Sequence, residues 1–151
     1  MSAFTPKAAD FAERVRSSFD RQPFMHTIGA SLARVAPGEV EIVMPVRPQL
    51  GQQHGFVHAG VVSALADTAC GYAAFSLMPA SAGVLTTEFK VNLLAPAAGE
   101  RLVAAGRVVK PGRTLTVAQG EVFAETGGAR RLVALLTATL MAVEDRDDVR
   151  D

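Results

Sequence analysis

Tryptophan is absent from the 151-residue sequence, which has one tyrosine and one cysteine, Cys70. A lone cysteine excludes an intramolecular disulfide framework and a cysteine-rich metal site. The scarcity of large aromatic side chains disfavours the stacking platforms that bind single-stranded nucleic acids. An excess of one charge is also missing, because 15 Lys and Arg residues balance 15 Asp and Glu residues. We therefore expect no nucleic-acid partner, and a surface that tolerates self-association.

A signal peptide is not evident, because the first 20 residues are mixed and charged. Residues 60–78 have one charge in 19 positions and approach the length of a membrane span. That charge, Asp67, lies near the centre, where a bilayer penalises it, and most of the run is small residues. The segment is therefore predicted to be a helix of a soluble protein, buried on nearly all sides and ended by Pro79. No membrane and a cytoplasmic location are expected.

The remaining chain predicts one α+β domain over residues 1–151, in which an antiparallel sheet wraps around this long helix. A short amphipathic helix is expected at residues 8–19, within the N-terminal segment 1–22, and Pro23 should stop it. Strands are expected at residues 32–46 (two strands around a Pro-Gly turn), 84–94, 101–109, 114–124 and 132–143. The charged tail 144–151 is expected to be frayed.

Alternation in residues 84–94 predicts two faces for that strand. Leu85, Thr87, Phe89, Val91 and Leu93 are expected on one face, and Thr86, Glu88, Lys90 and Asn92 on the other.

Asp67 is the candidate reactive group, because a carboxylate within an apolar helix is costly unless a functional site needs it. The preceding segment, residues 52–60 (QQHGFVHAG), brings polar side chains and glycine to the start of the helix. Free N–H groups at a helix N-terminus suit an oxygen that becomes negative, as in an oxyanion hole. A structural alternative is that Asp67 lies on a wetted face or caps a loop.

The spacing of these two features favours an oligomer. Asp67 follows Gly60 by seven residues, which corresponds to about 10.5 Å along a helix. An attacking water lies within about 3.5 Å of the carbonyl carbon whose oxygen the N–H groups hold. Two antiparallel helices related by a twofold axis would bring the N-terminus of one beside Asp67 of the other. Active sites at a subunit interface are therefore predicted, in a homodimer or a homotetramer built as a dimer of dimers.

Residues 58–67 (HAGVVSALAD) resemble the His-Gly-Gly-(x)5-Ala-Asp type of motif found in hotdog-fold acyl-CoA thioesterases of the PaaI family. Residues 89–97 (FKVNLLAPA) resemble the strand that follows the helix in this family, and residues 109–114 (VKPGRT) its next hairpin. The resemblance covers nearly the whole chain. It implies a single hotdog domain that hydrolyses a coenzyme A thioester to a free acid and CoA.

The resemblance also implies roles for particular residues. Asp67 matches the catalytic carboxylate, which acts as general base or as nucleophile. Ala59 stands where the family has a glycine whose N–H polarises the thioester carbonyl, next to Gly60. Gln52 falls where relatives carry Asn or Gln to orient the water or contact the thioester. Further roles fall on His58, which opens the motif, and Thr86, where some relatives carry a hydroxyl that positions the water.

A substrate contact is expected from Gln53, and the acyl group is expected to contact Phe56, Val61 and Tyr72. Lys110 and Arg113 are expected at the phosphates of CoA. Structural alternatives stay open for His58, Thr86 and the two basic residues. No metal is expected, because His54 and His58 lack a third ligand. No cofactor is expected, since CoA is part of the substrate.

Two other functions remain possible on this fold. One is a non-catalytic acyl-CoA-binding module, and the other is an enoyl-CoA hydratase, whose motif would need a histidine in the helix. The sequence does not identify the acyl group.

Overall fold

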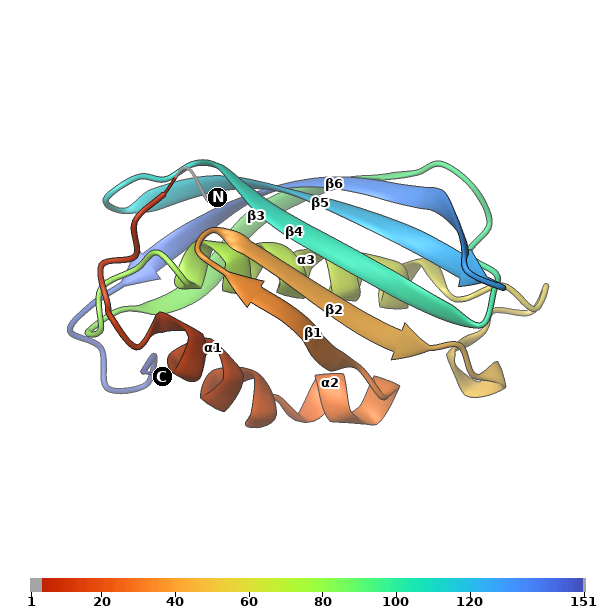
Figure 1. Cartoon of the computed structure of the whole chain (residues 1–151), viewed down its shortest axis with the longest axis horizontal. Helices are drawn as coiled ribbons and strands as arrows, with labels where there is room; N and C mark the ends of the chain where they lie inside the picture. Colours follow the sequence, from red (N-terminus) through yellow and green to blue (C-terminus); the bar gives the residue numbers. More distant parts are fainter. Residues whose placement is uncertain (1–3, 151) are drawn as a thin grey trace.

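The chain is described over residues 4–150 by a computed structural model. Its helices are α1 (Phe11–Asp20), α2 (Pro23–Ile28), the short 3-10 turn η1 (Pro48–Leu50) and α3 (Ala59–Phe75). Its strands are β1 (Ser31–Ala36), β2 (Glu39–Pro45), β3 (Gly83–Leu93), β4 (Arg101–Lys110), β5 (Leu115–Thr126) and β6 (Ala129–Val143). They form one antiparallel sheet in the order β1-β2-β4-β5-β6-β3. The sheet curves around α3 (Figure 1), which confirms the predicted α+β hotdog architecture.

The helix α3 lies unusually close to the middle of the sheet because two strand glycines face it. A Cβ atom added to Gly106 would lie 2.3 Å from the carbonyl carbon and oxygen of Ala69. A Cβ atom added to Gly120 would lie 3.0 Å from the sulfur of Cys70. Ala69 and Cys70 are themselves fully buried. Small residues on both sides therefore allow the close approach that fixes α3, and with it Asp67, against the sheet.

The ends of α3 differ from the prediction of residues 60–78. The helix begins at Ala59 with His58 as its N-cap, and it ends at Phe75. After the helix, two backbone hydrogen bonds join residues three positions apart, from the Leu77 N–H to the Ala74 carbonyl and from the Met78 N–H to the Phe75 carbonyl. The chain thus leaves the helix one turn before Pro79, whose ring disfavours helical geometry in the residue before it. Among the helices of residues 4–150, none has the length and hydrophobicity needed to cross a bilayer.

Two helices precede β1 where one was predicted. Val15 and Phe19 form the buried face of α1, as the amphipathic pattern indicated. Pro23 does not merely stop this helix, because it occupies the first turn of α2, where a missing N–H is tolerated. The prediction for residues 1–22 extends to residues 1–3, which lie outside the described residues, as does Asp151 of the predicted tail.

The predicted faces of β3 are wrong for its first half, because the register shifts between Thr86 and Glu88. Thr86 pairs with Leu140, and Phe89 pairs with Ala138. Both partners are buried on the helix-facing side of β6, so Thr86 and Phe89 share that side although they are three positions apart. The extra residue, Thr87, forms a β-bulge. Thr86 therefore faces α3, and does not share a face with Glu88 as the alternation suggested.

Candidate active site

Asp67 projects from α3 toward the beginning of β3, where Thr86 meets it. The hydroxyl of Thr86 donates a hydrogen bond of 2.8 Å to Oδ1 of Asp67. Burial raises the pKa of the Asp67 carboxyl above its ordinary value, and the bond from Thr86 lowers it in part. A carboxylate whose pKa is raised toward the working pH accepts a proton more readily than an ordinary aspartate. The pair is therefore chemically suited to activate a water molecule.

A cavity of about 200 Å³ surrounds this pair. It is lined by residues from three elements: Ser18 and Gln22 from α1 and the segment after it, Thr68, Gly71 and Tyr72 from α3, and Val84 from β3, besides Asp67 and Thr86. The contribution of the N-terminal segment was not predicted. The spacing of the apolar residues in α1 predicts only which face of the helix is buried. Ser18 is a polar residue at the border of that face. Tyr72 was expected near the acyl group, and it lines this cavity.

The start of α3 is organised by His58. The Nδ1 atom of His58 accepts a hydrogen bond of 2.8 Å from the N–H of Gly60, so the neutral ring carries its proton on Nε2. This bond occupies the N–H of Gly60, which was one candidate donor to a thioester carbonyl. Among the hydrogen bonds of residues 4–150, none is donated by the N–H of the exposed Ala59. The arrangement leaves Ala59 as the donor at this end of the helix.

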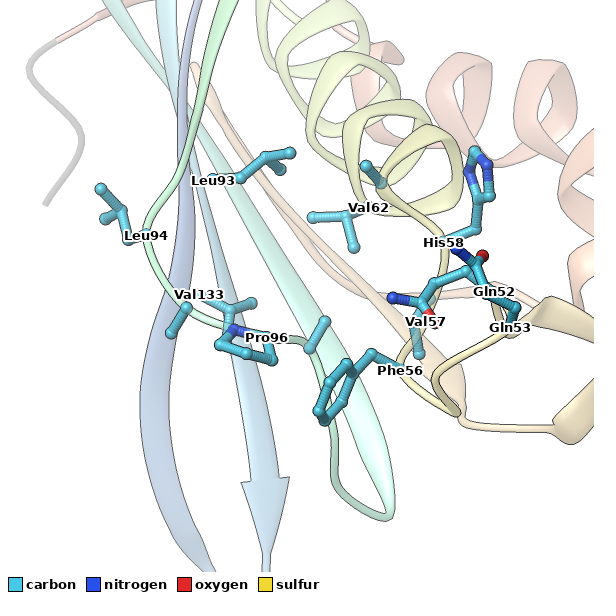
Figure 2. A pocket seen from close by; sticks show the side chains of 13 residues that line it. Gln52, Gln53, Phe56, Val57, His58, Val62, Leu93, Leu94, Pro96 and Val133 are labelled. Carbon is cyan, nitrogen blue, oxygen red and sulfur yellow. The ribbon is translucent and has the colours of Figure 1, made fainter.

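A second cavity, of about 450 Å³, lies beside the start of α3 (Figure 2). Gln52, Gln53, Phe56 and His58 line one side of it, and Leu93, Leu94, Pro96 and Val133 line the other. Gln52 is held in the loop, since its side-chain oxygen accepts a hydrogen bond from the N–H of His54. Val61 packs against the core and is absent from the lining, where its neighbour Val62 is found instead.

The structure keeps the predicted site residues of one chain in separate places. Asp67 and Thr86 line the smaller cavity, while Gln52 and His58 line the larger one. Lys110 and Arg113 flank the turn between β4 and β5, and Arg113 lines a cavity beside Met78 and Pro79, past the C-terminal end of α3. A single chain thus does not bring the predicted base, the predicted N–H donor and the predicted basic residues together at one place.

Among the described residues, no cluster of three His, Cys, Asp or Glu side chains is placed to hold a metal ion. Cys70 is fully buried three residues after Asp67. Burial, with a smaller contribution from the nearby Asp67 carboxylate, raises the pKa of its thiol to about 12. The thiol is therefore a packing group of the core rather than a nucleophile.

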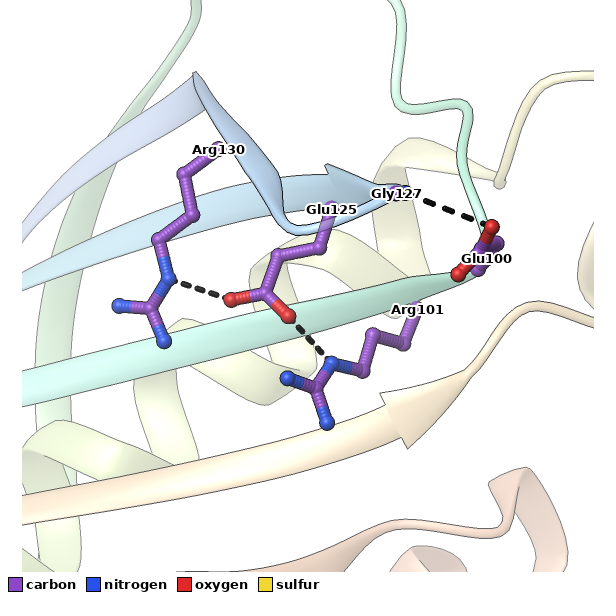
Figure 3. Close-up of polar contacts among 5 residues, drawn as sticks. All are labelled: Glu100, Arg101, Glu125, Gly127 and Arg130. Atoms are coloured by element: carbon purple, nitrogen blue, oxygen red, sulfur yellow. Dashed lines mark hydrogen bonds and ion pairs between the residues drawn. The ribbon is translucent and has the colours of Figure 1, made fainter.

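Charged side chains also gather at the end of the sheet where β4 begins and β5 ends (Figure 3). Glu125 accepts hydrogen bonds from Nε of Arg101 on β4 and from Nε of Arg130 on β6. These bonds, of which that from Arg101 has the larger effect, lower the pKa of Glu125. The carboxylate is only 5% exposed and is satisfied by two cations, so it links three neighbouring strands. We interpret this cluster as a structural clamp.

Comparisons with known proteins agree with this architecture. The family model described as the thioesterase superfamily matches residues 54–130, which include the start of α3, Asp67 and Thr86. A putative esterase of Halobacterium salinarum is 34% identical over 117 residues, which cover 74% of this chain and 77% of the relative.

One similar solved structure is that of a thioesterase family protein from Silicibacter pomeroyi, which is 57% identical to this chain. The match covers 89% of this chain and 98% of the Silicibacter chain, with a TM-score of 0.87. The PaaI protein of E. coli, from the phenylacetic acid degradation operon, is 20% identical over 91% of this chain and 96% of its own. Its TM-score of 0.78 shows that it shares the hotdog fold. The family model and the identity to these relatives show that the chain belongs to the thioesterase superfamily.

Proposed function

We propose that this protein hydrolyses acyl-CoA thioesters to a free carboxylic acid and CoA. The observation that carries the proposal is Asp67, a partly buried carboxylate with a raised pKa that accepts a hydrogen bond from Thr86 in the lining of a cavity. Membership of the thioesterase superfamily supports a hydrolase acting on a thioester. The acyl-CoA class comes from the resemblance of residues 58–67 to acyl-CoA thioesterases.

In the proposed reaction, Asp67 removes a proton from a water molecule as the water oxygen attacks the thioester carbonyl carbon. The carbonyl oxygen becomes negative and accepts a hydrogen bond from the N–H of Ala59 at the start of α3. The carbon–sulfur bond then breaks, the thiolate of CoA takes up the proton, and the acid leaves. Direct attack by Asp67, which forms an anhydride that water cleaves, would use the same groups.

The proposed site is completed by a second copy of the chain. The strand β3 is at the edge of the sheet, and its side chains Phe89 and Leu93, with Leu94 just beyond it, are about half exposed. An unpaired edge with exposed apolar side chains favours pairing with another strand. Antiparallel pairing of two β3 strands around a twofold axis would bring the Ala59 end of one α3 toward Asp67 of the other. We infer a homodimer, which can assemble further into a homotetramer.

The basic residues that would hold CoA fit the same assembly. Lys110 and Arg113 lie past the C-terminal end of α3, and antiparallel helices would place this end near the N-terminal end of the partner helix. Because the whole protein has no net charge, attraction for the CoA phosphates must come from such local cations. A cytoplasmic location, where the lone thiol would stay reduced, is part of the same proposal.

The proposal is tested by measuring thiol release from a panel of acyl-CoA esters, with the wild type beside Asp67→Asn. We expect the variant to lose about two to four orders of magnitude in kcat/KM, because the general base is removed. Glu13→Gln, which changes an exposed carboxylate on α1, is the matched control and should keep full activity. Equal turnover by wild type and Asp67→Asn would contradict the mechanism. Tight binding of an acyl-CoA that stays intact would instead indicate a binding module, and a gain of water by an enoyl-CoA would indicate a hydratase.

A further inference from the structure

Arg14 on α1 connects this helix to the segment between α3 and β3. Its Nη2 atom donates a hydrogen bond of 3.1 Å to the carbonyl of Ala82, and its Nη1 atom donates one of 3.4 Å to the carbonyl of Met78. The central carbon of its guanidinium group lies 4.5 Å from the ring centroid of Phe75, at the end of α3. Both carbonyls belong to buried residues. One cation thus bridges the N-terminal helix and the connection from α3 to β3.

The segments that Arg14 joins supply different walls of the cavity around Asp67. On α1, Ser18 follows Arg14 by one helical turn and lines the cavity. On the other side of the contact, Ala82 directly precedes β3, where Val84 lines the cavity. The two hydrogen bonds of Arg14 therefore tie the wall that α1 contributes to the wall that β3 contributes.

Apolar packing alone does not fix the distance between α1 and β3. Val15 and Phe19 bury one face of α1, but apolar contacts have no preferred direction. Hydrogen bonds do, because the donor and the acceptor must be aligned. The planar fork of an arginine can donate to two carbonyls while its face lies on an aromatic ring. Arg14 therefore fixes the position of α1 relative to both α3 and β3.

The position of α1 affects the burial of Asp67, because Ser18 and Gln22 form part of the cavity wall. Burial disfavours the charged form of the Asp67 carboxyl and raises its pKa. Of the described residues that line the cavity, Asp67 and Tyr72 are titratable, and Cys70, whose pKa is raised to about 12, lies in the core nearby. Neither a phenol nor this thiol is charged in the acid range. Burial is therefore the property of Asp67 that a displacement of α1 would change.

We propose that Arg14 is a positioning residue for the reaction: by binding the carbonyls of Met78 and Ala82, it keeps α1 against the cavity and shields Asp67 from bulk water. The inference rests on the proposed function, because shielding matters for catalysis only if Asp67 activates the attacking water. Arg14 is absent from the lining of the cavity. Its effect on the reaction is therefore transmitted through α1 and the start of β3.

The test compares Arg14→Met and Arg14→Lys with the wild type on the acyl-CoA ester that the wild type hydrolyses best. Methionine donates no hydrogen bond, whereas lysine keeps the charge but not the planar fork. We expect Arg14→Met to lower kcat by about tenfold, because a displaced wall disturbs the orientation of the reacting groups. KM should change by less than about twofold, since Arg14 does not line the site. Arg14→Lys should show a smaller loss, and Arg16→Met, at an exposed position of α1, is the matched control and should behave as the wild type.

The pH profile separates positioning from a general loss of stability. When α1 is displaced, water reaches Asp67 and its pKa falls toward the ordinary value of an aspartate. The acid limb of kcat/KM should therefore move to lower pH in both variants, by about half a pH unit or more in Arg14→Met. Removal of a positive charge alone would move this limb to higher pH, because a cation favours the ionised carboxylate. A purely structural role would lower the melting temperature and leave the limb in place.

The two proposals fail in different ways. If the wild type hydrolyses no thioester, the proposed function is wrong, and NMR titration of isotopically labelled aspartate side chains still tests the shielding: an Asp67 pKa in Arg14→Met equal to that of the wild type overturns it. If the wild type is active, the inference is overturned when folded Arg14→Met keeps its kcat, or when its acid limb stays in place or moves to higher pH. Should Arg14→Met fail to fold, Arg14→Lys decides by the same criteria.

Discussion

The hydroxyl of Thr86 donates to the carboxylate of Asp67 across 2.8 Å, although the two residues come from different elements of the fold. The bulge at Thr87 produces this contact, because it turns Thr86 toward α3 while Phe89 stays on the same side of the strand. Since a hydrogen bond to a carboxylate favours the ionised form, Thr86 holds the pKa of Asp67 below the value that burial alone would give.

Replacement of Thr86 by Val should shift the acid limb of the pH profile. Loss of the hydrogen bond raises the pKa of Asp67 further, so the carboxylate is protonated at a higher pH and the fall in kcat/KM on acidification begins earlier. At pH values on the acid limb, we expect kcat/KM of the variant to be about tenfold below that of the wild type, because hydrogen bonds to charged groups contribute about 1.5–3 kcal/mol. The measurement is kcat/KM against pH. Thr87→Val, which removes a hydroxyl bonded to the Thr139 carbonyl instead, should leave the profile in place.

The interface mechanism can be tested with a proline. Ala59 is the first helical residue of α3, where proline is tolerated, so Ala59→Pro should remove the N–H donor and keep the helix. We expect a loss of about two to three orders of magnitude in kcat/KM. Co-expression of Ala59→Pro with Asp67→Asn should restore about a quarter of wild-type activity, because half of the dimers are mixed and each has one intact site. Activity of the co-expressed protein no higher than that of the two single variants would show that each chain works independently.

Replacement by alanine should change the stability of the protein in opposite directions at Gly106 and at Gly71. Gly106→Ala places a methyl group onto the backbone of Ala69 and should destabilise the protein by more than about 3 kcal/mol. Gly71→Ala adds a methyl group in open space on a helix and should stabilise it by about 0.5–1 kcal/mol. Chemical denaturation of both variants measures the difference. Similar stabilities would contradict the close approach of α3 to the sheet.

The clamp around Glu125 should make stability depend on pH. The pKa of Glu125 is lowered in the folded protein, so its contribution is present above the ordinary range of glutamate and is lost as the pH falls through the lowered value. We expect Glu125→Gln to lower the melting temperature at neutral pH, and the difference from wild type to shrink on acidification. Glu39→Gln, which breaks the half-exposed pair with Arg34, should cost less than about 1 kcal/mol at any pH. A constant difference across pH would exclude the ionic interpretation.

The thiol of Cys70 should be unreactive in the folded protein. It is fully buried, and its pKa of about 12 leaves almost no thiolate near neutral pH. Iodoacetamide at pH 8 should therefore modify it only after denaturation, as mass spectrometry can show. Fast modification of the native protein would mean that α3 separates from the sheet at Gly120 far more readily than the packing indicates.

The fold was largely predictable because the strands alternate clearly and the Pro-Gly and Gly-Gly pairs mark the turns. The start of α2 was missed, since Pro23 is compatible with both the end of one helix and the first turn of another. The register of β3 was missed because nothing in the sequence indicates the bulge. Residues 84–94 alternate without interruption, and the sequence does not show which of Thr86 and Thr87 faces α3.

Part of the candidate site could also be predicted from the sequence. The charge of Asp67 in an apolar helix and the polar loop before it were sufficient to predict their separation along one helix. The cap formed by His58, which occupies the N–H of Gly60, depends on a rotamer and was not predictable. Neither was the contribution of Ser18 and Gln22, because they reach the cavity only through the packing of α1 beside α3.

The tight contact between α3 and the sheet has a consequence for how the enzyme could acquire new substrates. Positions such as Gly106 and Ala69 cannot take larger residues without moving the whole helix, and the Asp67 carboxylate would move with it. The segment around Ser18 and Gln22 lines the same cavity from α1 and the residues after it, which pack against α3 and β1 but are not strands of the sheet. Substitutions in this separate segment can therefore change the lining of the cavity, whereas the position of Asp67 is fixed by a part of the fold that tolerates little change.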